Sequence, residues 1–171
     1  MTATQMSNGA AEAGSDAHQV LTFHLAGETY GVDILRVQEI RGWSPVTRIP
    51  KTPKHVLGVL NLRGSIVPIV DLRVRFGLER AEFTPLTVII VLSIETEAGR
   101  REFGLVVDAV SDVVDLDVNA MRETPSLGGK ANAEFIGGLA TVDEKMLILL
   151  NVDELVGVDM SRESMELAGA A

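Results

Sequence analysis

The sequence predicts a mainly β protein built from two small barrels that share one hydrophobic core. Three observations lead to this fold. Short apolar segments of strand length recur along the 171 residues, with few long helical patterns between them. The composition is 46% hydrophobic but only 4% aromatic, so the core must consist mainly of Val, Ile and Leu. The two halves of the chain also resemble each other, and barrels of about 70 residues are marginal alone, which favours a common core.

The first module is expected at about residues 18–82 and the second at about 84–158. Within the first, Ala26-Gly27-Glu28 lies between two strand patterns and predicts a hairpin. The second opens with an almost wholly apolar run, which is typical of a strand buried on both faces. The expected strands cover residues 20–26, 29–33, 35–40, 46–49, 66–70, 86–94, 102–107, 110–116, 136–142 and 146–150.

An internal repeat supports the two modules. Residues 30–40 align with 103–113 at an offset of 73, and residues 52–77 align with 132–157 at an offset of 80. The second alignment places glycine on glycine at both Gly58/Gly138 and Gly77/Gly157. It also superposes Asp71 on Asn151, and both residue types favour the N-terminus of a helix. Residues 126–133 form a loop-like stretch that absorbs the change of offset.

The remaining segments and the composition limit the class of protein. Residues 1–17 are expected to be a disordered tail before a domain at 18–160, and residues 161–171 a tail compatible with a helix. The chain has no cysteine and no apolar run of the roughly 18 residues that cross a membrane. We therefore expect a soluble cytoplasmic protein without direct membrane insertion.

The segment from Gly58 to Arg73, GVLNLRGSIVPIVDLR, is the most informative stretch. Arg63-Gly64 between two apolar runs predicts a tight turn that directs a guanidinium outward, with Asn61 beside it. Pro68 cannot donate a ladder hydrogen bond, so its strand is expected at a sheet edge or beside a bulge.

Charge is distributed unevenly. The net charge is −9, yet residues 36–80 contain nine basic and three acidic side chains. Such a block can steer an acidic partner to one face, and it can equally be a solvated surface without a partner.

The residues give little support for catalysis or cofactor binding. The three histidines have no acid and nucleophile at catalytic spacing, and no phosphate-binding loop is present. Asp108, Asp112, Asp115 and Asp117 lack the rest of a calcium loop and are interpreted as the solvent face of a strand. The acidic charge and the lack of an aromatic platform argue against nucleic acid. We expect no enzyme activity, no cofactor and no metal.

Protein recognition is the interpretation that remains. Glu39 and Arg63 would form a charged pair if the fold brings them together. Such a pair could be an interface hot spot, or an intramolecular salt bridge that holds the turn. The residues alone favour neither.

The chain resembles the CheW family of chemotaxis coupling proteins over about residues 19–158. The resemblance lies in YGVDILRVQEIRG (30–42), VTRIP (46–50), NLRG (61–64) with IVPIVDLR (66–73), and VVDAVSDV (106–113). It implies two five-stranded SH3-like β-barrels on a common core. It also implies a non-enzymatic adaptor that couples the cytoplasmic tip of chemoreceptors to the histidine kinase CheA.

The resemblance also implies binding sites. CheA would be bound through its own CheW-like regulatory domain, and the proteins would associate in array rings recruited to the membrane by receptors. The implied receptor-binding groove between the barrels contains Val37, Glu39, Arg63, Val88, Gly104, Val110 and Val113. The implied motif turn contains Asn61 and Gly64, and the candidate kinase contacts are Val46, Leu57 and Ile66. A relative serving a non-chemotaxis array and a nucleic-acid-binding tandem barrel are the alternatives; the particular receptors, the ring stoichiometry and the role of the tails stay open.

Overall fold

The structure is a computed structural model that describes residues 17–79, 82–97, 99–117, 119, 121–123 and 135–155. The expected N-terminal tail, apart from Ala17, and the expected C-terminal tail lie outside the described residues. The elements are β1 Ala17–Leu25, β2 Glu28–Asp33, η1 Ile34–Arg36, β3 Val37–Gly42, β4 Val56–Leu62, β5 Ser65–Asp71, α2 Leu72–Arg75, β6 Val88–Thr96, β7 Gly99–Val107, β8 Ala109–Asp117, β9 Ile136–Val142 and β10 Lys145–Leu150.

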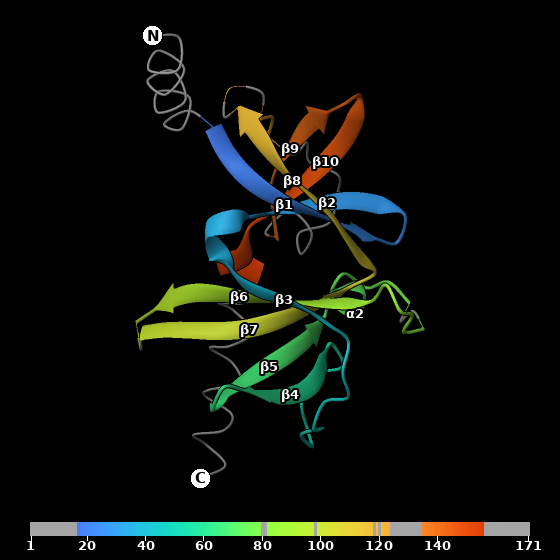
Figure 1. Cartoon of the computed structure of the whole chain (residues 1–171), viewed down its shortest axis with the longest axis vertical. Helices are drawn as coiled ribbons and strands as arrows, with labels where there is room; N and C mark the ends of the chain where they lie inside the picture. The colour runs from blue at the N-terminus through green and yellow to red at the C-terminus, as the bar shows by residue number, and fades with distance from the viewer. Residues whose placement is uncertain are drawn as a thin grey trace, which may run out of the picture.

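Two five-stranded sheets form the two barrels, as expected. Barrel A has the strand order β8-β1-β2-β10-β9, and barrel B has the order β3-β6-β7-β5-β4. Barrel A occupies the upper half of Figure 1 and barrel B the lower half. Each barrel closes through an extra backbone bridge to the segment that follows an edge strand, Arg122 to Leu139 in barrel A and Thr47 to Val59 in barrel B.

The division into sequential modules is wrong at the level of strands. Barrel A combines β1 and β2 from the start of the chain with β8, β9 and β10, whereas barrel B takes the five strands between them. Figure 1 shows this as blue strands lying beside yellow and red ones in the upper half. The first two strands of each repeat therefore pair with the last three of the other. The physical reason is that β2 and β7 add in parallel to the final strand of the opposite copy, a contact that strand patterns alone do not specify.

The repeat itself is confirmed by backbone register. In barrel A, Leu149 of β10 lies opposite Gly31 of β2, and in barrel B the repeat-equivalent Ile69 lies opposite Gly104. The bulge in β4 at Val56/Gly58 recurs in β9 across from Leu149/Leu150. A single backbone plan is thus used twice, with the strands exchanged between copies.

The shared core is also as expected. Its main cluster joins Leu21 and Phe23 of barrel A to Ile90 and Leu92 of barrel B, all at most 2% exposed. Strand β6 has six consecutive buried residues, 89–94, which confirms a strand covered on both faces. Smaller clusters fill the interior of each barrel separately. The core between the barrels therefore fixes their relative position.

Pro68 does not lie on an edge strand. Strand β5 pairs with both β4 and β7, but its pairing with β7 begins only at Ile69. Opposite Pro68 in β4, Val59 exchanges both backbone hydrogen bonds with Thr47. Neither neighbour therefore needs a donor at residue 68, and an interior strand accommodates the proline.

Candidate functional site

The motif turn between β4 and β5 presents Arg63 on a two-residue hairpin. Arg63 and Gly64 both have positive φ, 54° and 88°, which is the conformation of a type I′ turn. The side chain of Asn61 accepts a hydrogen bond from the Gly64 N–H at 2.9 Å. The repeat-equivalent residues Asp143 and Glu144 adopt the same conformation, with φ of 52° and 66°. Both copies of the repeat therefore have the same turn geometry, but only the turn of the first copy carries a guanidinium.

The fold brings Arg63 and Glu39 together. The Arg63 Nη2 donates to Glu39 Oε1 at 2.8 Å, joining the hairpin to strand β3. The arginine side chain stays 75% exposed, and the glutamate side chain 30%. A pair this exposed contributes about 0 to 1 kcal/mol to folding. The pair orients Arg63, and most of the guanidinium surface stays accessible.

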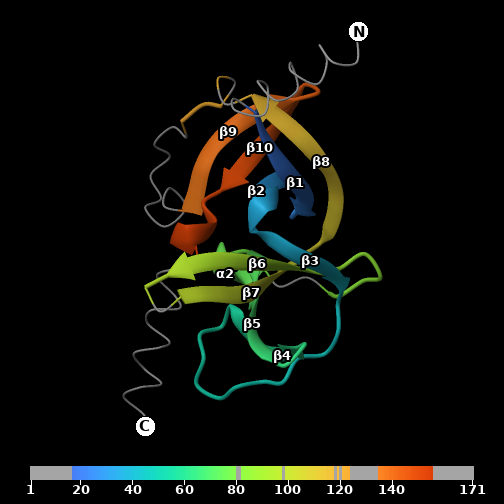
Figure 2. The same cartoon turned by 60° about the vertical axis from the view of Figure 1, so that its left-hand side comes forward.

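Three of the expected groove valines pack against the core that the two barrels share. Val37 begins β3, Val88 begins β6 and Val110 lies near the start of β8, and all three are half-buried against the shared core cluster. Val37 and Val110 are repeat-equivalent. Strands β3 and β8 are the edge strands of their sheets, so among the described residues no further strand pairs with their outer edges. In Figure 2 the start of β8 lies close to β3 at this junction.

The same junction exposes apolar side chains, one of which the sequence reasoning missed. Val113 on β8 is 49% exposed and Ile40 on β3 is 43% exposed. They are equivalent in the repeat, because Val113 lies opposite Leu21 as Ile40 lies opposite Ile90. Ile40 lies within the aligned segment, so extending the expected site through the repeat would have found it.

Gly104 does not line an accessible surface. It is buried inside barrel B, and a Cβ there would lie 2.7 Å from atoms of both Ile69 and Ile89. The position requires glycine because two core side chains pass over the backbone, and direct contact with a partner would require the barrel to open.

The candidate kinase contacts differ in accessibility. Ile66 is 64% exposed at the start of β5. Val46 is half-buried against the interior cluster of barrel B, and Leu57 belongs to that cluster with 8% exposure. Of the three, only Ile66 presents a largely free side chain.

Ion pairs hold the two places where the described chain crosses between barrels. At the β7–β8 crossing, Asp108 accepts two hydrogen bonds from Arg73 of α2, from Nε at 2.8 Å and from Nη2 at 2.6 Å. Its carboxylate also accepts the Ala26 N–H of the β1–β2 turn at 2.9 Å. At the β2–β3 crossing, Arg36 of η1 donates to Asp153 at 2.8 Å. Arg73 and Asp153 are repeat-equivalent, so the two pairs occupy matching places with reversed charge.

These contacts correct the interpretation of Asp108 as a solvent-facing acid. Hydrogen bonds from Arg73 are the main cause that holds the pKa of Asp108 below its usual value; burial opposes them and the Ala26 N–H adds to them. The same hydrogen bond raises the pKa of Arg73. The interpretation is right for Asp112, Asp115 and Asp117, which are exposed on β8.

In the part of the chain that the structure describes, no three His, Asp or Glu side chains gather in a way that would hold a metal ion. Within the same residues, no helix is long and apolar enough to cross a membrane. The geometry at the barrel junction, with exposed aliphatic side chains beside an oriented arginine, suits contact with another protein.

Comparison with known proteins identifies the family. The model of the CheW-like domain matches residues 19–159. The chain belongs to the CheW family. It is 45% identical to the chemotaxis protein CheW of Klebsiella aerogenes over 149 residues, covering 87% of this chain and 85% of the relative. It is 35% identical to CheW of Rhizobium meliloti over 150 residues, covering 88% and 94%. CheW proteins are scaffolds in chemotaxis and not enzymes.

A solved CheW structure supports the fold. The scaffolding protein TtCheW of Thermoanaerobacter tengcongensis superposes with a TM-score of 0.73 at 35% identity, covering 81% of this chain and 86% of that one. The two SH3-like barrels seen here are therefore the CheW fold. Within it, exposed aliphatic side chains lie along β3 and β8, and the exposed Arg63 stands on the turn between β4 and β5.

Proposed function

We propose that this chain is a cytoplasmic adaptor that couples chemoreceptors to the histidine kinase CheA, so that ligand sensing controls kinase activity. The observation that carries the proposal is the seam between β3 and β8. There, Val37 and Val110 lie half-buried beside the exposed Ile40 and Val113, at the junction of the two barrels. An aliphatic surface between two rigid units is suited to the helical tip of a receptor, in the helix-in-groove mode.

Arg63 supplies orientation in this proposal. Its side chain is 75% exposed, and Glu39 binds its guanidinium from β3. A carboxylate or carbonyl of the receptor can then be bound by donors that Glu39 leaves free. The aliphatic residues supply contact area and Arg63 supplies register. Val88 completes the floor of the groove, and Gly104 supports it from within barrel B.

The kinase is proposed to bind elsewhere on barrel B. Ile66 is the exposed anchor of this second surface, and Val46, which packs against the interior cluster of barrel B, and Leu57, which belongs to that cluster, are its less accessible members. The partner would be the CheW-like regulatory domain of CheA, and repeated contacts of this kind would build array rings. Ile66→Ser is expected to weaken capture of CheA and leave receptor binding unchanged. An Ile66 variant that loses both partners equally would argue against separate surfaces.

The experiment that tests receptor coupling is co-sedimentation with receptor-bearing membranes, with and without CheA. Arg63→Ala should weaken receptor binding about 30-fold, the equivalent of about 2 kcal/mol for a central arginine. Asp143→Ala is the matched control, since it truncates the same turn position in the other copy. Receptor binding by the Arg63 variant at the level of the control would contradict the role of Arg63. Failure of the unaltered protein to bind either partner would contradict the function.

A further inference from the structure

Barrel A contains a cavity of its own, distinct from the hollow that Leu57 and Arg48 line in barrel B. Its volume is about 250 Å³, and its walls come from β1, β2, β8, β9, β10 and the residues just after β10. None of the residues proposed above for receptor or kinase contact lines it. The cavity therefore carries an inference that is independent of the proposed function.

The repeat explains why the cavity exists. Inside barrel B, Leu57 and Trp43 fill the interior, and Trp43 stacks on Phe83 with ring centroids 3.9 Å apart. The equivalent positions in barrel A are Gly137 and Leu116, both of which line the cavity. In barrel B, these two backbone positions thus carry a leucine and an indole ring. In barrel A, they carry a hydrogen atom and a smaller aliphatic group.

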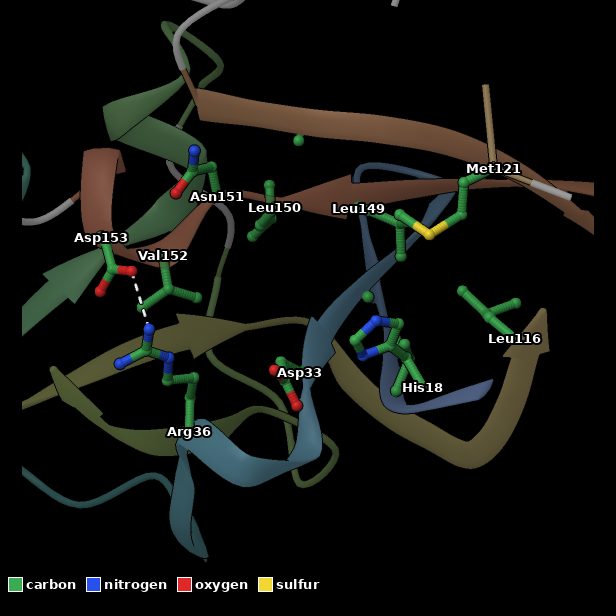
Figure 3. A pocket seen from close by; sticks show the side chains of 13 residues that line it. His18, Asp33, Arg36, Leu116, Met121, Leu149, Leu150, Asn151, Val152 and Asp153 are labelled. Carbon is green, nitrogen blue, oxygen red and sulfur yellow. Dashed lines mark hydrogen bonds and ion pairs between the residues drawn. The ribbon is translucent and has the colours of Figure 1, made fainter. Parts of the chain in front are cut away.

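The cavity is apolar at one end and polar at the other. Figure 3 shows Leu116, Met121 and Leu149 on one side, with the imidazole of His18 among them, and the Arg36–Asp153 pair across from them. Between the two ends, Asp33 stands where barrel B has the buried Val106, so one wall bears a carboxylate in place of an aliphatic group.

The polar end favours a hydrogen-bond donor. Asp33 Oδ1 accepts the N–H of Leu35 at 3.0 Å, which uses only one of the roughly four lone-pair directions of a carboxylate. Arg36 and Asp153 largely neutralise each other. Of the other polar side chains on the wall, His18, Asn151 and Asp33, Asp33 carries the charged acceptor that suits a ligand N–H.

We propose that this cavity is a binding site for a small bicyclic aromatic compound with one N–H donor, of the indole class. Two observations support this class of ligand: the volume of the cavity and the side chain at the equivalent place in barrel B. An apolar protein cavity of about 150 Å³ binds benzene, so a space of 250 Å³ accommodates two fused rings. At the equivalent place in barrel B, the indole of Trp43 lies partly buried against the interior cluster. The rings would lie against Leu149 and Met121, with the N–H directed to Asp33.

The test is titration of the full-length protein with indole, followed by NMR of the methionine methyl groups. The Met121 signal should shift and saturate, whereas Met146, which is 55% exposed on β10 outside the cavity, serves as the internal control. For a ligand of about nine non-hydrogen atoms we expect a dissociation constant of about 1 mM.

Gly137→Leu is the informative variant. A Cβ at residue 137 has no neighbour closer than 3.7 Å and the backbone there is not left-handed, so a side chain is tolerated. In barrel A, the new leucine should reproduce the packing that Leu57 has in barrel B. It should therefore weaken indole binding at least tenfold. Gly42→Leu is the matched control, because Gly42 is exposed on β3 and a Cβ there meets nothing within 4 Å. This control should bind indole like the unaltered protein.

Three outcomes would overturn the proposal. One is the absence of a saturable shift at Met121. A second is binding to Gly137→Leu that equals binding to the control variant, which would place indole elsewhere. The third is a nuclear Overhauser contact, in ligand-free protein, between Met121 and a residue in 124–134 or beyond 155, which would mean that the chain itself fills the site. None of these readouts depends on receptors or CheA, so failure here and failure of the proposed function are distinguishable.

Discussion

Removal of the Asp108 carboxylate should weaken the joint between the barrels. Asp108 accepts two hydrogen bonds from Arg73 and one from Ala26, so it connects α2 of barrel B to the first hairpin of barrel A. The side chains of Arg73 and Asp108 are 23% and 31% exposed, between a buried and a surface pair. Hydrogen bonds to charged groups contribute about 1.5 to 3 kcal/mol when shielded, and exposed ion pairs about 0.2 to 1. We expect Asp108→Ala to lower the free energy of unfolding by about 2 kcal/mol.

The repeat supplies the comparison. The matching pair Arg36–Asp153 has one hydrogen bond, of 2.8 Å, and its side chains are 33% and 52% exposed. Its removal by Asp153→Ala should cost about 0.5 kcal/mol. Urea unfolding monitored by the fluorescence of the single Trp43 measures both values, and a double-mutant cycle with Arg73→Ala isolates the coupling energy, expected at about 1 kcal/mol. Equal losses from the two aspartate variants, or a coupling energy of zero, would refute the reasoning.

The same pair predicts a pH dependence with a definite sign. The unfolded carboxyl titrates near 3.8, and the hydrogen bonds from Arg73 hold the folded pKa of Asp108 below that value. The pair therefore stabilises the fold fully above about pH 5, and this stabilisation is lost as the pH falls below 3.8 and through the folded pKa. The difference in unfolding free energy between the unaltered protein and Asp108→Ala should shrink over that acid range. A difference that is the same at neutral pH and in acid would contradict the assignment.

Two further predictions concern the repeated backbone. Arg63→Asn should change the free energy of unfolding by less than about 1 kcal/mol, because relief of the left-handed backbone offsets the lost ion pair. The control Asp143→Asn, at nearly the same φ, should be neutral. A large loss of stability for Arg63→Asn in thermal unfolding would contradict this and show that the ion pair holds the fold. Gly58→Ala should cost about 3 kcal/mol or more, since its Cβ would lie 2.2 Å from the Thr47 carbonyl, whereas Gly138→Ala meets a carbonyl at 3.1 Å and should cost about 1 to 2. Urea unfolding of both glycine variants checks the order, and equal costs would contradict it.

Much of the fold could be predicted from sequence because it depends on local signals. The hairpin at Ala26-Gly27, the turn at Arg63-Gly64 and the buried strand at 89–94 each follow from a few adjacent residues. The capping residues Asp71 and Asn151 accept backbone hydrogen bonds as expected. One expected strand, 46–49, is reduced to a single bridge, since this segment closes the barrel and does not extend the sheet.

Pairing between distant segments is the part that could not be predicted. Nothing near β2 specifies that it adds to β10, because parallel pairing depends on which partner completes the core. The ion pair of Asp108 was missed for the same reason, since Arg73 lies 35 residues away. Glu39 and Arg63 could be proposed as a pair only on the condition that the fold brings them together, since they lie 24 residues apart.

The exchange of strands explains how a repeated fold can hold an asymmetric site. Because each barrel contains strands of both copies, the edge strands β3 and β8 become equivalent partners across one junction, each with a valine at its start and an exposed aliphatic residue three positions on. Two sequential barrels would have placed these strands in unrelated surroundings. The seam is symmetric, so a single difference between the two equivalent turns is enough to make its two ends distinct. Arg63 stands on one hairpin and Asp143 on its equivalent, so in the proposed function a partner along the seam would meet a cation in one barrel and an acid at the equivalent place in the other.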